Sequence, residues 1–481
     1  MATESIRFVL DGDIIELDEV DPTRTVLQFL REDLGRTGTK EGCAEGDCGA
    51  CTVVLAELTG SGDDIRLRPV NACIQFLGTL DGKELITVES LARGNAGLHP
   101  AQAAMVEQHG SQCGFCTPGF VMSLLVLYEE GGQPTRRRID DALAGNLCRC
   151  TGYRPIIAAA RAMHELPANG VQLTHPGQLK SIARGAAFET GKAGRRFLAP
   201  TTLPETAQCL ADFPDATLLA GGTDIGLWVT KQHRNIDTVI YIGNVRELRL
   251  VETSKSHLEI GAAVPLADAI PPLVALYPGL DELFRRFASP PIRNAGTLGG
   301  NVANGSPIGD SMPALMVLGT SVVLHGSAGR REVSLEDFYI DYMVNDLKPG
   351  EFIEKLRIPL PDKADIVASY KWSKRFDQDI SGVCTAYRLR LDDDVVTSIR
   401  IACGGMAATV RRAHACEAAL SGQTWSQATI DAGMAALARD YAPISDMRAT
   451  ADYRLRAARN LLQRFYLETR GEAGSLYAYG R

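Results

Sequence analysis

The chain has 481 residues, a length that suggests about three domains. Hydrophobic residues make up 45% and charged residues 22%, the composition of a soluble globular protein. The formal net charge of −8 argues against a nucleic-acid-binding protein, and no apolar run reaches the roughly 20 residues that cross a membrane. The N-terminal residues lack a basic stretch followed by an apolar core, so we expect no signal peptide and a cytoplasmic location.

Residues 1–88 are expected to form a small α+β domain. Apolar and polar residues alternate over 5–17 around an Asp-Gly-Asp turn, which predicts a β-hairpin. Apolar residues at helical spacing predict a helix over 25–34, and short apolar runs predict strands over 52–55 and 85–88. A loop rich in cysteine and glycine follows the predicted helix.

The first cysteine set lies in that loop, with the spacing C-x4-C-x2-C and a fourth cysteine farther along the chain. It consists of Cys43, Cys48, Cys51 and Cys73. This is the spacing of plant-type [2Fe–2S] ferredoxins. Glycines in the loop allow its backbone N–H groups to approach the cluster sulfurs. A structural zinc site is the alternative, but zinc sites favour paired short spacings such as C-x2-C twice.

Residues 89–165 are expected to form a four-helix bundle that holds a second cysteine set. Helical patterns cover 101–109, 120–128, 140–145 and 155–165. The second set has the spacings C-x2-C and C-x-C and consists of Cys113, Cys116, Cys148 and Cys150. Alone, this pattern also suits zinc, whereas beside the first motif it favours a second iron–sulfur cluster.

The remaining residues divide into three parts by composition and periodicity. They are a linker at 166–195, an α+β domain at 196–362 and a C-terminal α+β subdomain at 363–481. The subdomain is expected to place strands within 367–401 and helices at 425–437 and 450–469. The scattered cysteines of these parts are expected to be small core residues, namely Cys209, Cys384, Cys403 and Cys416.

Two glycine-rich segments stand out in the third domain, at 218–226 and 294–305. Neither is a G-x-G-x-x-G motif or a P-loop. Backbone amides in such segments can cradle a pyrophosphate as an anion-binding nest. Ordinary tight turns are the alternative, and these residues alone do not decide between the two.

Three motifs together make the chain resemble a known family. They are EGCAEGDCGAC at 41–51, QCGFCTPG at 112–119 and NLCRCTGYR at 146–154. With them, the chain resembles the small subunits of bacterial xanthine dehydrogenases, in the molybdenum hydroxylase family, over essentially its whole length. The resemblance implies a plant-type ferredoxin β-grasp domain, a four-helix [2Fe–2S] bundle and an α+β FAD-binding domain of the molybdenum hydroxylase flavoprotein type with a C-terminal α+β subdomain.

The resemblance also implies roles for individual residues. The second cysteine set would hold the cluster nearer the molybdenum cofactor, and the first set would hold the cluster nearer the flavin. Gln112 would touch the pterin of the molybdenum cofactor across a subunit boundary; a solvated loop amide is the alternative. The acidic stretch 377–379 either lines the flavin edge or is a solvated loop.

The flavin site implied by the resemblance draws on both glycine-rich segments and on later residues. Its members are Leu218, Leu219, Ala220, Gly221, Gly222, Thr223, Asp224, Ile225, Phe287, Thr297, Gly300, Asn301, Asp310, Ile353 and Lys371. Without the resemblance, the favoured interpretation of Phe287 is a core aromatic. Ile353 stands where relatives have Leu, which keeps an apolar wall, and Thr297 stands where relatives can have Ser, which keeps the hydroxyl.

The resemblance implies an electron path from a molybdenum cofactor through two [2Fe–2S] clusters to FAD and then to NAD+, in the oxidation of hypoxanthine and xanthine. The 481 residues contain no molybdopterin motif, so we expect that cofactor and all substrate chemistry on a partner subunit, in an α2β2 heterotetramer, with no catalytic residue on this chain. Two alternatives remain at this point. One is the equivalent subunit of a hydroxylase for aldehydes or N-heterocycles, and the other is a zinc-binding interaction protein.

Overall fold

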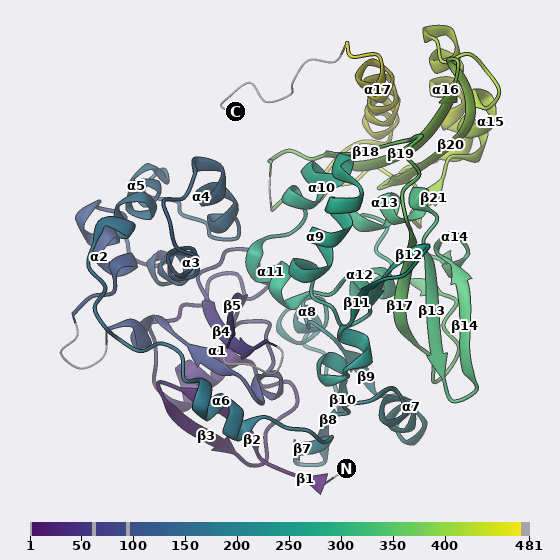
Figure 1. Cartoon of the computed structure of the whole chain (residues 1–481). Coiled ribbons are helices and arrows are strands. Elements are labelled where there is room, and N and C mark those ends of the chain that lie inside the picture. The colour runs from purple at the N-terminus through teal and green to yellow at the C-terminus, as the bar shows by residue number, and fades with distance from the viewer. Residues whose placement is uncertain (1, 60–63, 93–96, 377, 473–481) are drawn as a thin grey trace. The chain divides into compact units, whose positions relative to one another are not determined.

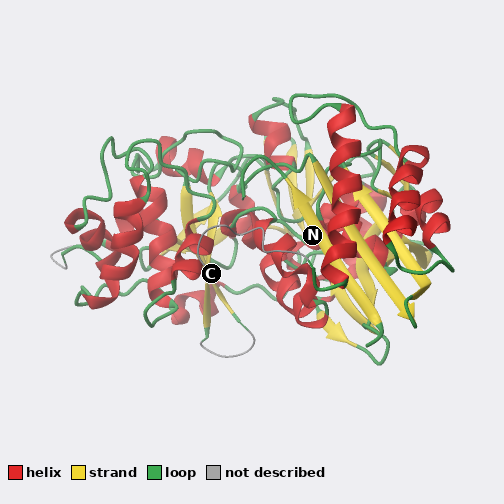
Figure 2. Ribbon diagram, turned by 90° about the horizontal axis from the view of Figure 1, so that it is seen from above, coloured by secondary structure: helices red, strands yellow, loops and turns green. Residues whose placement is uncertain are grey.

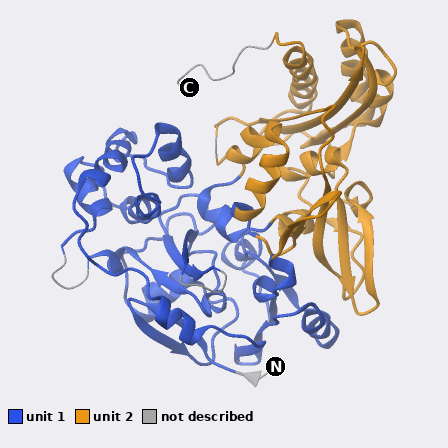
Figure 3. Ribbon diagram, viewed as in Figure 1, with its two compact units in different colours: residues 1–249, 265–267, 288–297 blue, residues 250–264, 268–287, 298–481 orange. Residues whose placement is uncertain are grey.

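The computed structural model describes residues 2–59, 64–92, 97–376 and 378–472. The chain divides into two compact units, and each is considered by itself (Figure 3). The first unit comprises 1–249, 265–267 and 288–297, and the second comprises the remaining residues. Helices and strands occur throughout (Figure 2), as expected for an α+β chain. None of the helices in the described ranges is both long and apolar enough to cross a membrane.

The first unit begins with a β-grasp domain (Figure 1). The predicted hairpin is confirmed, and the predicted helix is a short α-helix, capped by Thr25, that continues into a π-helical turn over Phe29–Asp33. Phe8 and Leu30 lie fully buried between helix and sheet. The sheet has the order β3-β2-β6-β4-β5. The elements are β2 (Ile6–Leu10), β3 (Asp13–Leu17), α1 (Val26–Gln28), β4 (Thr52–Leu58), β5 (Ile65–Asn71) and β6 (Glu84–Ile86), with 3-10 turns at Leu77–Leu80 and Val88–Leu91.

The four predicted helices of the next domain are all present. The central helix of this bundle is the second of the four, over Thr117–Glu129. It is apolar on nearly every side, and its residues Phe120, Leu124 and Leu125 are fully buried. The bundle also covers Val54 and Ala56 of β4, which joins it to the β-grasp domain in one core. The helices are α2 (Pro100–Glu107), α3 (Thr117–Glu129), α4 (Arg136–Leu143) and α5 (Arg154–Ala162), followed by a 3-10 turn at Met163–Glu165.

Residues 166–195, expected to form a linker, contain a helix and a strand. Leu179 and Ile182 of that helix are buried against Val9 of the β-grasp sheet, so this stretch is tied to the domain it leaves. A second sheet of the first unit has the order β1-β7-β8-β10-β9. Its elements and their companions are β1 (Ala2–Thr3), α6 (Pro176–Ile182), β7 (Phe188–Lys192), β8 (Arg195–Ala199), α7 (Leu203–Asp212), β9 (Thr217–Leu219), α8 (Ile225–Thr230), β10 (Thr238–Tyr241), α11 (Pro290–Ala295) and 3-10 turns at Ile242–Asn244 and Glu247–Arg249.

The second unit contains an antiparallel sheet with the order β11-β12-β17-β13-β14. Leu258, Ile260 and Leu356 on neighbouring strands are buried, because alternate residues of these strands face the covering helices. The elements are β11 (Val251–Thr253), β12 (His257–Gly261), most of α9 (Leu266–Leu276), a 3-10 turn at Pro278–Leu280, α10 (Asp281–Arg286), α12 (Leu298–Asn304), α13 (Ser311–Leu318), β13 (Ser321–Gly326), β14 (Gly329–Ser334), α14 (Leu335–Phe338), β15 (Tyr339–Asp341), β16 (Val344–Asn345) and β17 (Phe352–Pro359).

The C-terminal part of the second unit is a sheet followed by helices, in the predicted order. Tyr387 of the sheet stacks on Phe465 of the last helix with ring centroids 4.7 Å apart, so the two layers share one core. Thr450 caps that helix at its predicted start. The elements are β18 (Asp365–Trp372), β19 (Val383–Asp392), β20 (Val395–Gly404), β21 (Arg411–Arg412), α15 (His414–Leu420), α16 (Gln427–Asp440) and α17 (Ala451–Thr469).

Candidate cluster and flavin sites

The first cysteine set is brought together by the loop that precedes β4 and the turn that follows β5. The Cys43 thiol lies against the thiols of Cys48 and Cys73, and the Cys51 thiol lies against that of Cys73. Cys51 and Cys73 are buried, whereas Cys43 and Cys48 are half-buried. The fold therefore gathers all four predicted thiols in one place.

The electrostatics of this set favour a bound cationic group. Hydrogen bonds from Cys48 and Cys73 hold the pKa of the Cys43 thiol far below its usual range. The same contacts raise the pKa values of Cys48 and Cys73, because neighbouring thiols resist joint ionisation. The backbone N–H groups of Glu45, Asp47 and Cys48 also donate to Cys43 Sγ at 3.4, 3.3 and 3.3 Å. Iron would remove the repulsion that keeps the other thiols protonated.

The second cysteine set is gathered by the loop before α3 and the loop between α4 and α5. The Cys113 thiol lies against that of Cys150, and the Cys116 thiol lies against that of Cys148. Burial and the contact with Cys148 raise the pKa of Cys116 to about 12. The pKa of Cys148 is lowered: burial opposes this, but hydrogen bonds from the side chain and backbone of Thr151 outweigh it. The N-cap of α3 is Cys116 itself, so α3 begins three residues before the predicted range of 120–128.

Thiol contacts link all four members of the first set in a row and join the second set in two pairs. Among the described residues, no group of three or more His, Cys, Asp or Glu side chains has the geometry of a site for a single metal ion. In the first set Cys43 contacts Cys48 and Cys51 contacts Cys73, and a further contact joins Cys43 to Cys73. Together with the two pairs of the second set, these contacts are compatible with a binuclear group in which each iron takes two thiolates. The thiolate donors thus fit [2Fe–2S] clusters.

The loop of the first set contacts both of the other predicted sites in the first unit. On one side, the Leu147 N–H beside Cys148 donates to the Cys48 carbonyl at 3.0 Å. On the other side, the Thr230 hydroxyl at the end of α8 donates to the Ala44 carbonyl at 2.7 Å. This loop is therefore bonded to the second cysteine set and to the helix that follows the first glycine-rich segment.

The first glycine-rich segment joins β9 to α8. A Cβ on Gly221 would lie 1.9 Å from the carbonyl oxygen of Ala295, so only glycine allows this close approach of two backbones. Gly226 lies against Ile74, the neighbour of Cys73, where a Cβ would come within 2.7 Å. Thr297, the other predicted flavin residue of this unit, is buried. Tight glycine turns and backbone amides at a helix start are what binding of a pyrophosphate requires.

The second unit contains the remaining predicted flavin residues. Asp310 and Lys371 form a fully buried ion pair, and the Ser381 hydroxyl donates to the other Asp310 oxygen at 2.6 Å. The Ser311 hydroxyl donates to the Asn301 side chain at 2.5 Å, close to Gly300 on α12. Nothing in the sequence predicted a contact between Asp310 and Lys371, and the fold joins them through their side chains.

The apolar flavin candidates of the second unit lie at the ends of ordered elements. Phe287 follows α10, is half-buried and meets Phe284 edge-on with ring centroids 6.4 Å apart. Ile353 lies buried on β17. Arg286, which the sequence did not single out, is buried and donates to the carbonyls of Lys371 and Phe376, both at 2.8 Å. Only its position beside Phe287 could have suggested it.

Two further predictions concern exposed residues. Gln112 is exposed and directly precedes the exposed Cys113, so its amide is open to solvent or to another molecule. Of the acidic stretch 377–379, Asp377 lies outside the described residues. The Asp379 side chain accepts from the Arg375 backbone N–H at 2.9 Å.

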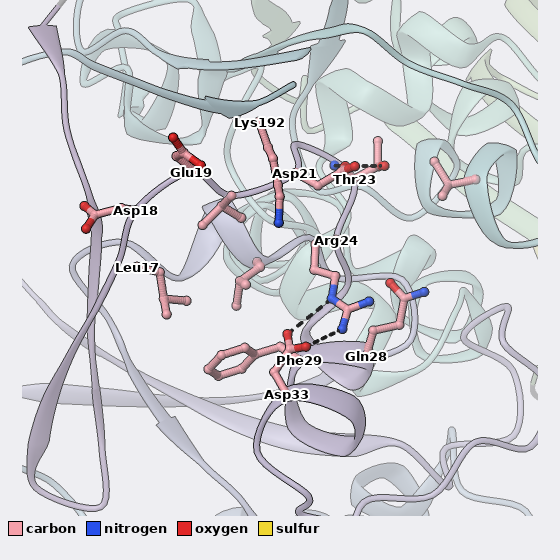
Figure 4. A pocket seen from close by; sticks show the side chains of 13 residues that line it. Leu17, Asp18, Glu19, Asp21, Thr23, Arg24, Gln28, Phe29, Asp33 and Lys192 are labelled. Atoms are coloured by element: carbon pink, nitrogen blue, oxygen red, sulfur yellow. Dashed lines mark hydrogen bonds and ion pairs between the residues drawn. The ribbon is translucent and has the colours of Figure 1, made fainter. Parts of the chain in front are cut away.

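A cavity of about 700 Å³ in the first unit lies near the turn after β3 (Figure 4). No predicted cluster or flavin residue lines it. Three of its charged side chains form ion pairs: Arg24 binds Asp33 and also Glu32, each at 2.7 Å, and Asp21 binds Arg195. We therefore assign no function to this cavity.

Comparison with known families finds four matching stretches of the chain. Residues 8–76 match the 2Fe-2S iron-sulfur cluster binding domain, and residues 87–161 match the [2Fe-2S] binding domain. Residues 189–361 match the FAD binding domain in molybdopterin dehydrogenase. Residues 368–469 match the CO dehydrogenase flavoprotein C-terminal domain.

Similar full-length proteins and solved structures come from one group of enzymes. Xanthine dehydrogenase of Emericella nidulans is 33% identical, and the match covers 96% of this chain and 38% of that protein. Bovine aldehyde oxidase 1 is 29% identical, and the match covers 96% of this chain and 39% of that protein. The chain thus spans about two fifths of these curated relatives.

A chain of carbon monoxide dehydrogenase from Hydrogenophaga pseudoflava is 30% identical with a TM-score of 0.54, over 56% of this chain and 94% of that one. A chain of quinoline 2-oxidoreductase from Pseudomonas putida 86 is 28% identical with a TM-score of 0.53. The match covers 57% of this chain and 96% of that one. Together with the four domain matches and the two gathered cysteine sets, these similarities place the chain in the molybdenum hydroxylase family, as an electron-transfer member with two [2Fe–2S]-binding domains and an FAD-binding domain.

Proposed function

We propose that this chain carries electrons from a molybdenum cofactor on a partner subunit, through two [2Fe–2S] clusters, to FAD and then to NAD+, in the oxidation of hypoxanthine and xanthine. The observation that carries the proposal is the position of the first cysteine loop within its unit. Hydrogen bonds join that loop to the second cysteine loop at Cys48 and to the helix after the glycine-rich segment at Ala44. This order of contacts suits a serial path with the first cluster in the middle.

When bound, clusters that exchange single electrons and a flavin that exchanges one or two convert a two-electron oxidation into single-electron steps. The residues of this chain hold and tune those groups. We propose the two cysteine sets as the iron ligands, and the exposed Gln112 as the contact with the partner's pterin. Backbone N–H groups directed at Cys43 Sγ would stabilise negative charge on that ligand and raise the potential of its cluster.

For the flavin, we propose the residues that the family resemblance assigned. The amides of 218–225 would bind the diphosphate, and Asp310 would bind the adenosine side while Lys371 holds its carboxylate. Phe287 and Ile353 would supply apolar contacts to the ring system. None of these residues acts on the reducing substrate, so this chain would hold no catalytic residue for hydroxylation.

The test compares the purified chain with its complex. The isolated chain should contain iron and flavin and should reduce an artificial dye with NADH, but it should not oxidise hypoxanthine. Addition of the molybdenum subunit should restore hypoxanthine oxidation with NAD+. Hypoxanthine turnover by the isolated chain, or a colourless preparation that binds zinc, would contradict the proposal.

A second candidate is the equivalent role in an aldehyde or N-heterocycle hydroxylase. The similarity to bovine aldehyde oxidase 1 and to quinoline 2-oxidoreductase favours it. The partner that co-purifies with the chain decides between the two, because substrate contacts would lie on that partner. Turnover of quinoline or an aldehyde, without turnover of xanthine, would select the second candidate.

A further inference from the structure

Asn146 is a buried amide in the first unit that touches both cysteine loops and is itself no ligand candidate. The residue is 4% exposed and lies in the loop after α4, two positions before Cys148. Its Nδ2 donates to the Gly49 carbonyl at 3.1 Å and to Thr52 Oγ1 at 3.3 Å. Its Oδ1 accepts from the Ser123 hydroxyl at 2.6 Å. Both ends of the amide are therefore satisfied by segments distant in the sequence.

The main chain next to Asn146 joins the two loops directly. The Leu147 N–H donates to the Cys48 carbonyl at 3.0 Å. Cys48 belongs to the first cysteine set, and Leu147 precedes Cys148 of the second. A single peptide hydrogen bond thus connects a ligand residue of one set with the neighbour of a ligand residue of the other.

The close approach of the loops depends on glycine at two positions. A Cβ on Gly49 would lie 2.0 Å from the Gly145 carbonyl oxygen, and a Cβ on Gly119 would lie 2.1 Å from the Gly49 carbonyl oxygen. Both distances are well inside van der Waals contact, so larger residues would force the loops apart. The amide of Asn146 therefore spans a junction that is already shaped for backbone contact.

We propose that Asn146 is a positioning residue that fixes the Cys48–Leu147 hydrogen bond and thereby sets the electronic coupling between the two clusters. In the step it serves, one electron leaves the cluster of the second set, which is oxidised, and enters the cluster of the first set, which is reduced. No bond forms or breaks and no proton moves. This inference rests on the proposed function, because it requires both clusters.

Asn146→Asp in the full chain with its clusters is the direct test. Asp has nearly the same shape, but it removes the donor and sets a carboxylate against the Gly49 carbonyl, which pushes the loops apart. After full reduction, the splitting that spin–spin interaction causes in the electron paramagnetic resonance spectrum should narrow or vanish. Rapid-mixing reduction should show severalfold slower equilibration between the clusters, at unchanged iron content.

Asn169→Asp is the matched control. Asn169 also donates its amide to two main-chain carbonyls, those of Leu91 and Gly97, at 2.9 and 3.2 Å, and neither acceptor lies in a cysteine loop. This variant loses comparable hydrogen bonds and should keep the spin–spin splitting. Loss of splitting in both variants would mean that coupling responds to general loosening, which overturns the proposal.

The remaining outcomes are also decisive. An unchanged splitting in Asn146→Asp, with both clusters present, refutes the positioning role and leaves the proposed function intact. If Asn146→Asp does not assemble its clusters, Ser123→Ala replaces it, since this change frees only the Oδ1 end of the amide. The splitting should then narrow slightly, and no change would refute the proposal. A wild-type chain without the two cluster signals would instead refute the proposed function.

Discussion

The cysteine sets and the flavin candidates are built in different ways. Each cysteine set gathers its thiols within the first unit, from loops at the ends of neighbouring elements. The flavin candidates are dispersed, with 218–225 and Thr297 in the first unit and residues such as Asp310 and Lys371 in the second. A cluster site needs cysteines at a defined spacing along the sequence, whereas a flavin contact depends on backbone shape and burial. A single cysteine substitution should therefore remove one cluster and leave the other, whereas the flavin candidates cannot be divided into separate sites in this way.

The largest expected effect comes from Cys73→Ser. Because Cys73 contacts both Cys43 and Cys51, its loss should prevent assembly of the first cluster, and the iron content should fall by about half. Cys116→Ser is the matched change in the second set and should remove the other cluster signal. Each variant should retain the remaining cluster in its electron paramagnetic resonance spectrum. Loss of both clusters from a single change would show that the two sites do not assemble independently.

The next effect is expected at the buried ion pair of the second unit. Lys371→Met leaves the Asp310 carboxylate buried without its cation, which should lower the free energy of unfolding by about 3–5 kcal/mol. Flavin content after purification should fall while the visible absorbance of both clusters remains. Urea unfolding and flavin extraction measure the two effects.

A double variant separates stability from flavin binding at this pair. Asp310→Leu combined with Lys371→Met removes both charges, which is often nearly neutral for folding, so much of the lost stability should return. Flavin content should stay low, because the proposed adenosine contact of Asp310 is gone. Recovery of flavin in the double variant would show that this pair supports the fold and does not bind the cofactor.

A smaller effect is expected from Gly221→Ala in the first glycine-rich segment. The added Cβ would meet the Ala295 carbonyl oxygen, and the shift of the loop should cost about 1–3 kcal/mol of stability and weaken flavin binding. Gly177→Ala in α6 is the control, because no atom lies within 4 Å of its Cβ position. Thermal unfolding should place Gly221→Ala below the wild type and Gly177→Ala at or above it. Equal melting temperatures for the two variants would contradict the assigned close approach.

The sequence was sufficient for the parts of the fold that local patterns determine. The hairpin around Gly12, the helices of the bundle and the order of strands and helices at the C-terminus were all predicted. The cysteines were named from their spacing, and the fold gathers each set. Arg286 and Ser381 were missed, and Asn146 was noted only as the first residue of a motif, because the importance of all three arises from partners far away in the chain. No periodicity or motif reports on such partners, so only the fold reveals them.

The smallest expected effect is a pH dependence confined to the second unit. Backbone N–H groups of Ala449 and Arg448 and the guanidinium of the buried Arg454 lower the pKa of Asp446 to about 2, although burial opposes the shift. Because the folded-state pKa lies below the ordinary value of 3.8, this carboxylate stabilises the fold above about pH 4, and the stabilisation is lost as the pH falls toward 2. Asp446→Asn should therefore be less stable than the wild type at neutral pH by about 1–2 kcal/mol, a figure reduced because the carboxylate is partly exposed. Urea unfolding of both proteins from pH 6 to pH 3 measures the difference, which should shrink on acidification. A difference that stays constant with pH would mean that Asp446 acts through its shape and not through its charge.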